Sequence, residues 1–141
     1  MVDFPLQNIL FRNSDSESSM VRLIIVKVAS GCDIIESILD VGRKNHTSLT
    51  IQSASGTIAS VTLGDNPDVR FYGPFNIVSL TGSYLYHNQD TPLLELIPPP
   101  SFSFGLILST RHGSAFGGNV GGRLIAHNDV NLTIFTFNNE S

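Results

Sequence analysis

The sequence predicts an α+β domain built on a mostly antiparallel β-sheet with one main helix. Three observations lead to this class. A short β-branched run occupies residues 22–28, and the stretch after Asp33 repeats its apolar residues at helical spacing. From Thr47 onward the apolar segments are short and are separated by Gly, Pro, Asn and Ser. One helix set between strands and then a run of strands is typical of α+β domains.

The first predicted elements are a buried strand at residues 22–28 and the helix that follows it. Asp33 is a good N-cap, and Glu36 completes a spacing that resembles a capping box. Two basic residues in the last turn suit the helix dipole, so the helix should end near Asn45. The face that packs on the sheet is expected to contain Ile34, Ile35, Ile38, Leu39 and Gly42.

The middle of the chain predicts strands broken by turns. A strand that includes Leu49 and Ile51 should end in a turn or bend at Ser53–Gly56. A second strand spans 58–63, and Gly64–Asp68 is a strong loop signal. Residues 69–72 and 75–86 form either a strand pair or one long kinked strand. Because Pro74 cannot donate a ladder hydrogen bond, we expect a bulge, break or edge there.

The last third of the chain predicts further strands. An apolar segment at 93–97 ends at Pro98–Pro100, and strands at 104–109 and 119–127 flank a glycine-rich turn. The final strand begins at Val130, and its apolar residues change parity at Phe135 and Phe137. A bulge near Ile134 would explain the change, as would a strand with two buried faces.

The length and composition predict one domain with an unusual surface. The chain has 141 residues, of which 1–20 are expected to be a flexible leader and 21–138 the domain. Charged residues make up 14% of the chain, against about 25% in an average soluble domain. Either part of the surface is buried in an oligomer, which we favour, or the surface is rich in Ser, Thr and Asn.

The charge distribution does not predict a nucleic-acid-binding face. The net charge is −4, and the eight Lys and Arg residues are scattered, with only Arg43 and Lys44 adjacent. Nucleic-acid affinity comes mainly from clustered cations that neutralise phosphates. A basic patch assembled from distant segments is a less favoured alternative. No apolar run approaches the roughly 20 residues that span a bilayer, so we expect no membrane association.

The sequence contains no convincing catalytic constellation. His46, His87, His112 and His127 fit no standard zinc spacing, and the glycines between 113 and 122 match neither a dinucleotide-binding nor a Walker pattern. Cys32 stands alone and is expected to be a packed thiol. We therefore predict no catalytic residue, no metal site, no cofactor and no enzymatic activity.

One segment carries a specific family resemblance. Residues 73–84 read Gly-Pro-Phe-Asn-Ile-Val-Ser-Leu-Thr-Gly-Ser-Tyr. This resembles the signature of the plant and prokaryote conserved (PPC) domain of AT-hook motif nuclear-localized proteins, in which Gly-Arg-Phe-Glu-Ile-Leu precedes a Ser-Leu-Ser-Gly-Ser-Phe-like run. Pro74 replaces the family's Arg, and Asn76 replaces its Glu. The retained residues are Gly73, Phe75, Ile77, Ser79, Leu80, Gly82 and Ser83.

Four further segments follow the family's order, so the resemblance covers about residues 22–138. Gly31–Ser37 is similar to the family's helix start, and Ser53–Leu63 to its Ser-Gly-x-Gly-Thr-Val-x-Asn-Val-Thr segment. Leu106–Leu108 together with Phe116–Gly122 looks like its closing glycine-rich element, and Val130–Phe137 like its last strand.

The resemblance implies a nuclear protein that assembles as a trimer with itself and related PPC-domain proteins. It implies regulation of transcription, with the hexapeptide recruiting transcription factors. The partner-binding residues would then be Gly73, Pro74, Phe75, Asn76, Ile77 and Val78.

In the plant proteins an Arg-Gly-Arg-Pro hook enters the minor groove of AT-rich DNA, and these 141 residues contain no such motif. We therefore expect weak or no autonomous DNA binding, with AT-rich DNA reached through hooked partners. The alternative is a stand-alone small-ligand or metal-binding domain, with an enzyme as one form of it. The altered hexapeptide fits a specialised subunit and a non-functional duplicate equally well.

Overall fold

The computed structural model describes residues 9–10, 21–65, 69–87 and 101–138. The predicted apolar segment at 93–97 and the polar part of the leader lie outside the described residues. The elements are β1 (Ile9–Leu10), β2 (Arg22–Val28), α1 (Ile34–Asn45), β3 (Ser48–Ser55), β4 (Thr57–Leu63), β5 (Arg70–Tyr84), β6 (Phe102–Ser109), β7 (Ala115–Ala126) and β8 (Val130–Phe137).

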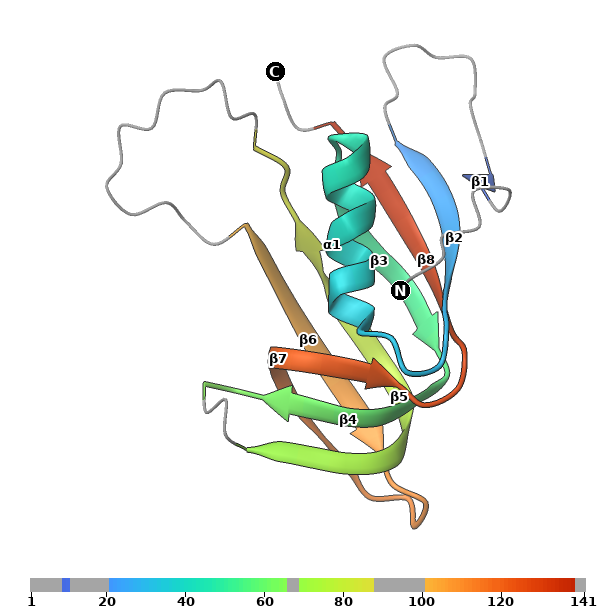
Figure 1. Cartoon of the computed structure of the whole chain (residues 1–141), viewed down its shortest axis with the longest axis vertical. Helices are drawn as coiled ribbons and strands as arrows, with labels where there is room; N and C mark the ends of the chain where they lie inside the picture. The colour runs from blue at the N-terminus through green and yellow to red at the C-terminus, as the bar shows by residue number, and fades with distance from the viewer. Residues whose placement is uncertain (1–8, 11–20, 66–68, 88–100, 139–141) are drawn as a thin grey trace.

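The strands form one antiparallel sheet, as predicted, and this sheet curls on itself. Its eight strands lie in the order β1-β2-β8-β3-β5-β4-β7-β6, and β5 also pairs with β6. That extra pairing closes β5, β4, β7 and β6 into a ring. Figure 1 shows the consequence: the long strands and α1 occupy one part of the molecule, and β4, β7 and the start of β5 cross them in the other.

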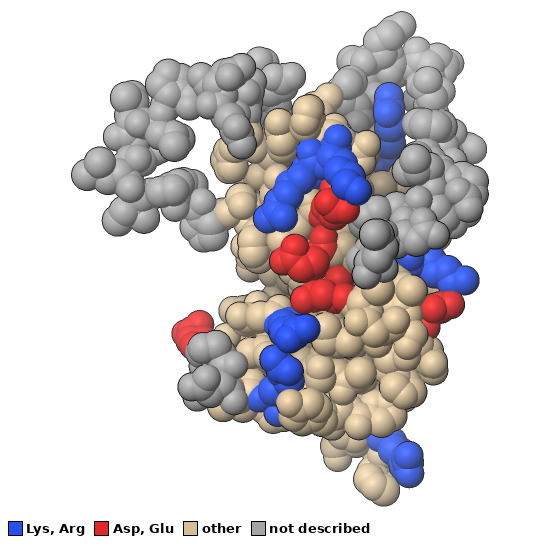
Figure 2. Space-filling view, in the orientation of Figure 1, with Lys and Arg blue, Asp and Glu red and all other residues tan. Residues whose placement is uncertain are grey.

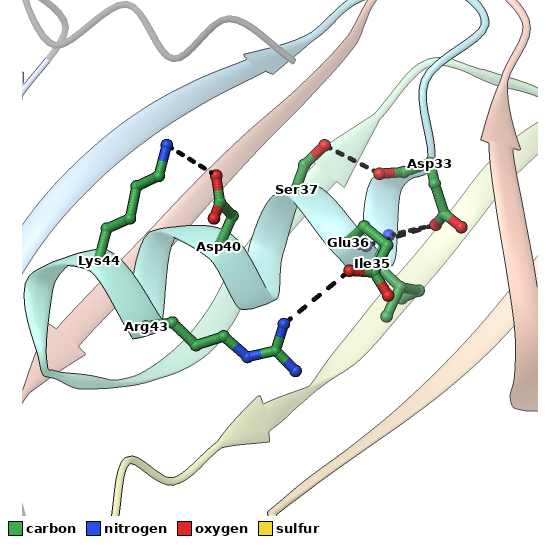
Figure 3. A network of polar contacts seen from close by, with 7 residues as sticks. All are labelled: Asp33, Ile35, Glu36, Ser37, Asp40, Arg43 and Lys44. Atoms are coloured by element: carbon green, nitrogen blue, oxygen red, sulfur yellow. Dashed lines mark hydrogen bonds and ion pairs between the residues drawn. The ribbon is translucent and has the colours of Figure 1, made fainter. Parts of the chain in front are cut away.

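Helix α1 begins and ends where the sequence predicts. The Asp33 carboxylate accepts hydrogen bonds from the backbone N–H groups of Ile35 at 3.0 Å and Glu36 at 3.4 Å, as Figure 3 shows. The helix closes at His46, which adopts the left-handed conformation. The predicted apolar face is buried, and Ser37 and Val41 are buried with it. Ser37 satisfies its hydroxyl by donating to the carbonyl of Asp33 at 2.8 Å.

The core is one cluster formed by the buried face of α1 and the inward-facing side chains of the sheet, those of the ring included. Alternate residues of each strand point into it, as the period of a β-strand requires. Strand β2 contributes Ile24, Val26 and Val28, and β6 contributes Phe104, Leu106 and Leu108. The complete separation of buried and exposed positions along these strands fixes their register, because a one-residue slip would expose the whole set.

The predicted turn at Ser53–Gly56 is wrong except at its last residue. Strand β3 continues to Ser55, because Ser53 and Ser55 pair with Thr133 and Asn131 of β8. Only Gly56 separates β3 from β4. Small polar residues indicate turns in a sequence, but here a neighbouring strand supplies their backbone with partners.

The glycine-rich segment is also strand rather than turn over most of its length. The turn lies at 110–114, and β7 begins at Ala115, earlier than predicted. Gly117 pairs with Ile107, and a Cβ at this position would collide with the carbonyl oxygen of Leu106. The glycine thus permits two backbones to approach closely, which is the structural explanation for glycine within a strand.

The final strand resolves the parity change at Phe135 and Phe137. Strand β8 pairs with β2 from Val130 to Thr136 without a register shift. Ile134 is buried on the helix side, while Phe135 and Phe137 lie half-buried on the opposite face. The second alternative is therefore correct, because β8 carries apolar residues on both faces. The bulge near Ile134 belongs to β3, at Gln52.

Candidate partner-binding surface

The segment Gly73–Val78 lies where β5 changes its pairing partner. Asn76 pairs with Thr57 of β4 and also with Ser109 of β6. Before this residue β5 runs beside β4, and after it β5 runs beside β6. Residues 69–72 and 75–86 were expected to form either a strand pair or one long kinked strand, and the second alternative is correct. The predicted partner residues form the bend of this strand.

Two irregularities bracket the segment. On the β4 side, Ile58 pairs with Phe75 and Ser60 with Tyr72, so Gly73 and Pro74 together oppose one residue. This is the bulge predicted from Pro74. Gly73 cannot carry a side chain here, since a Cβ would lie 2.5 Å from both the Ile58 carbonyl oxygen and the Phe75 nitrogen. On the β6 side the register shifts at Val78.

The side chains of the segment alternate between the core and the outside. Phe75 and Ile77 are half-buried and pack against the core, and the ring of Phe75 meets that of Phe116 edge-on at 5.0 Å. Pro74, Asn76 and Val78 are exposed, with 55% of Val78 accessible. The exposed half is uncharged, so contacts made here depend on shape, apolar area and hydrogen bonding.

A second surface is the face of the sheet opposite α1, the one helix of residues 9–10, 21–65, 69–87 and 101–138. We call it the uncovered face because this helix does not cover it. It includes one cross-strand row of paired residues, running from Leu23 through Phe135 and Thr50 to Ser83 and Ser103. Ile25 and Thr133 form a neighbouring pair, and at the far side Ile107 pairs with Ser79 and remains 45% exposed.

The uncovered face is almost without charge. Among the paired residues of β2, β8, β3, β5 and β6 that share it, Lys27 is the one charged side chain, at the end of β2. Lys27 is also 3.3 Å from Asp129. Apolar and hydroxyl side chains make up the rest. The low charge content was explained either by a surface that an oligomer buries or by a surface rich in Ser, Thr and Asn, and this face fits both explanations.

The structure also brings together two arginines, Arg70 and Arg123, that are far apart in the sequence. On one side of β4, Arg70 of β5 pairs with Thr62. On the other side lies β7, where Leu124 pairs with Val61 and Arg123 is the residue before Leu124. Figure 2 shows basic side chains over this part of the sheet, below the acidic residues of α1. No sequence signal links these arginines, because only the strand order makes them neighbours.

Three titratable side chains take part in capping or packing contacts. Burial raises the pKa of the Asp33 carboxyl above its ordinary value, although hydrogen bonds from Glu36 and Ile35 act in the opposite direction. Cys32 packs against the core as a partly buried thiol. His46 stacks on Tyr86 with ring centroids 5.1 Å apart.

Two kinds of site are not found in the described part of the chain. Within residues 9–10, 21–65, 69–87 and 101–138, no group of three or more His, Cys, Asp or Glu side chains is arranged to hold a metal ion. Over the same residues, α1 is too short and too polar to cross a membrane.

Comparison with known proteins identifies the family. The model of the Plants and Prokaryotes Conserved domain matches residues 15–138. The chain belongs to this family. Its match to "AT-hook motif nuclear-localized protein 29" of Arabidopsis thaliana has 32% identity over 134 residues and covers 86% of this chain and 42% of the relative. The chain thus spans about half the length of the curated relatives that it matches.

Solved structures have the same fold. A plant- and prokaryote-conserved protein of Pyrococcus horikoshii superimposes with a TM-score of 0.62 at 15% identity, covering 87% of this chain and 82% of that protein. A Ralstonia eutropha protein whose name proposes DNA binding gives a TM-score of 0.64 at 12% identity, with coverages of 94% and 84%. At these identities the likeness concerns the fold, and it confirms the predicted antiparallel sheet with a single helix.

Proposed function

We propose that the protein is a non-enzymatic nuclear regulator of transcription that acts by assembly. Three copies, or copies mixed with related PPC-domain chains, associate through the uncovered face. The exposed residues of Gly73–Val78 remain available for transcription factors. AT-rich DNA is reached through the hooks of partner chains.

The observation that carries this proposal is the chemistry of the uncovered face. Interfaces are depleted of charge at their centre and enriched in aromatic and apolar residues. Phe135, Leu23 and Ile107 supply apolar area, and the row of small hydroxyl residues between them lets a second sheet approach. A monomer would leave this wide uncharged surface in water.

The nuclear and regulatory parts of the proposal rest on the relatives. Proteins that match most of this chain are named AT-hook motif nuclear-localized proteins. The 141 residues contain no Arg-Gly-Arg-Pro and carry a net charge of −4, which disfavours autonomous binding to a polyanion. A hookless subunit would reduce the number of DNA contacts in a mixed assembly, and multivalent affinity depends steeply on that number.

Two measurements test the proposal in sequence. Light scattering coupled to size exclusion gives the mass of the full chain at micromolar concentration, and three times the chain mass is expected. The chain is then co-expressed with a hooked relative, and the mixture is titrated against AT-rich duplex in a gel-shift assay. The mixed assembly should bind more weakly than the hooked relative alone. A monomer in the first measurement, or unchanged affinity in the second, would contradict the proposal.

A further inference from the structure

Arg70 and Arg123 form a compact cationic pair on the outer side of β4. Arg70 pairs with Thr62 across one edge of β4, and Arg123 faces the other edge, where the residues between Val120 and Leu124 bulge around Thr62. Neighbouring strands lie about 4.8 Å apart, which separates the two arginine backbones by about 10 Å. Both side chains are exposed, whereas Thr62 between them is buried.

Two basic residues of α1 already have acidic partners. Arg43 lies 3.9 Å from Glu36, and Lys44 lies 3.1 Å from Asp40, as the network in Figure 3 shows. The Asp33 carboxylate is occupied by the first turn of α1. Within the described residues no carboxylate forms an ion pair with Arg70 or Arg123, so both guanidinium groups can bind an external anion.

An exposed aromatic side chain completes the surface. Tyr72 is two residues from Arg70 on β5, so it lies on the same side of the strand, and 71% of it is accessible. It pairs with Ser60, which is buried beside it. Tyrosine offers a large contact area with few rotamers to restrict, which explains its enrichment in recognition surfaces.

We propose that Arg70, Tyr72 and Arg123 form a docking site for an extended acidic segment of a partner protein. A chain in the extended polyproline II conformation advances about 3.1 Å per residue with three residues per turn. Carboxylates three positions apart therefore lie on one side of it, about 9 Å from each other along the chain, which matches the spacing of the two arginines. Each guanidinium can receive one carboxylate through two parallel hydrogen bonds. This site is distinct from the uncovered face and from Gly73–Val78, and it does not depend on the assembly proposed above.

A peptide is favoured over a nucleic acid by the number of cations. Proteins that hold duplex DNA neutralise many phosphates, typically six to ten, and this surface offers two arginines in a chain with a net charge of −4. Two guanidinium groups suffice for a short motif with two acidic residues.

The test is a fluorescence anisotropy titration of the full chain into rhodamine-labelled Ser-Gly-Glu-Ser-Gly-Glu-Ser-Gly at low ionic strength. The same peptide with Gln in place of Glu, and a labelled AT-rich duplex, form the other arms. The double variant Arg70→Gln/Arg123→Gln should bind the Glu peptide about fivefold more weakly, since exposed ion pairs contribute modestly. Arg43→Gln/Arg111→Gln removes the same charge elsewhere and should stay within twofold of the wild type.

Each outcome decides the proposal. Preference for the Glu peptide, lost only in the Arg70/Arg123 variant, supports it. Equal binding of the Glu and Gln peptides, or equal loss in both double variants, overturns it. Tighter binding of the duplex that depends on the same arginines would assign the surface to nucleic acid instead. The variant Arg70→Lys/Arg123→Lys keeps the charge but not the paired hydrogen bonds, and an intermediate loss of about twofold is expected.

Discussion

Replacing Ile107 by lysine provides a direct test of the uncovered face. Ile107 lies on that face beside Ser79, and 45% of its side chain remains accessible in the single chain. Full burial of an isoleucine contributes about 1.5–3 kcal/mol. The part still exposed therefore stands to contribute about 0.7–1.4 kcal/mol per copy on assembly, or about 2–4 kcal/mol for three copies.

Ile107→Lys removes this contribution and adds three ammonium groups to an apolar interface. The association constant of the assembly should fall by at least about 30- to 1,000-fold, at 1.4 kcal/mol per factor of ten. The assay is sedimentation velocity over a concentration series from submicromolar to about 100 μM. The monomer fraction should rise strongly at low micromolar concentration, while thermal unfolding of the diluted chain changes little.

Val69→Lys is the matched control for this experiment. Val69 is 41% exposed and directly precedes β5 at the end that runs beside β4, so it is not among the residues of the uncovered face. The substitution is chemically similar but leaves the uncovered face intact, so the assembled mass should not change. If both variants dissociate equally, or if the assembly tolerates Ile107→Lys, the reasoning about this face is wrong.

Three further substitutions test the fold around the site. Asp33→Ala should lower the free energy of unfolding by about 1 kcal/mol because it removes the helix cap, whereas Asp33→Asn keeps the cap. Burial raises the pKa of the Asp33 carboxyl in the folded state. The wild type should therefore gain stability relative to Asp33→Asn as the pH falls from 7 to 3. It should lose that gain as the pH rises through the folded pKa. Gly73→Ala should cost about 1–3 kcal/mol in urea unfolding, because the added Cβ meets two backbone atoms. Leu108→Ala should cost about 2–5 kcal/mol because this side chain is completely buried.

Each of these predictions has an internal comparison. Gly105→Ala introduces a Cβ that makes only an ordinary 3.6 Å contact with Thr81, so it should change stability by less than about 0.5 kcal/mol. A loss equal to that of Gly73→Ala would show that the bulge is not tightly packed. A flat difference between wild type and Asp33→Asn from pH 3 to 7 would contradict the raised pKa of that carboxyl.

The helix and most strands were predictable because their signals are local. The cap at Asp33, the apolar spacing after it and the basic last turn all lie within one short stretch, and the helix ends where they indicate. The bulge at Pro74 was likewise predictable, because the missing N–H is a property of the proline itself.

The errors arose where a distant strand decides the outcome. Ser53 and Ser55 resemble a turn until β8 supplies hydrogen-bond partners, and Gly117 resembles a turn residue until β6 approaches its backbone. The pairing of Arg70 with Arg123 across β4 has no local signal at all. It depends on the strand order, in which β5 and β7 flank β4 although they are separated along the chain.

The closure of β5 onto β6 limits how this protein can misassociate. A sheet with open ends can add strands from other molecules and grow into fibrils. Among the described residues, the ring of β5, β4, β7 and β6 has no end strand. The sheet of the described residues ends at the short strand β1, which pairs with β2 only at Leu23 and Ile24. Aggregation or exchange of strands between molecules should therefore begin at β2, and stronger pairing there would make the chain more soluble.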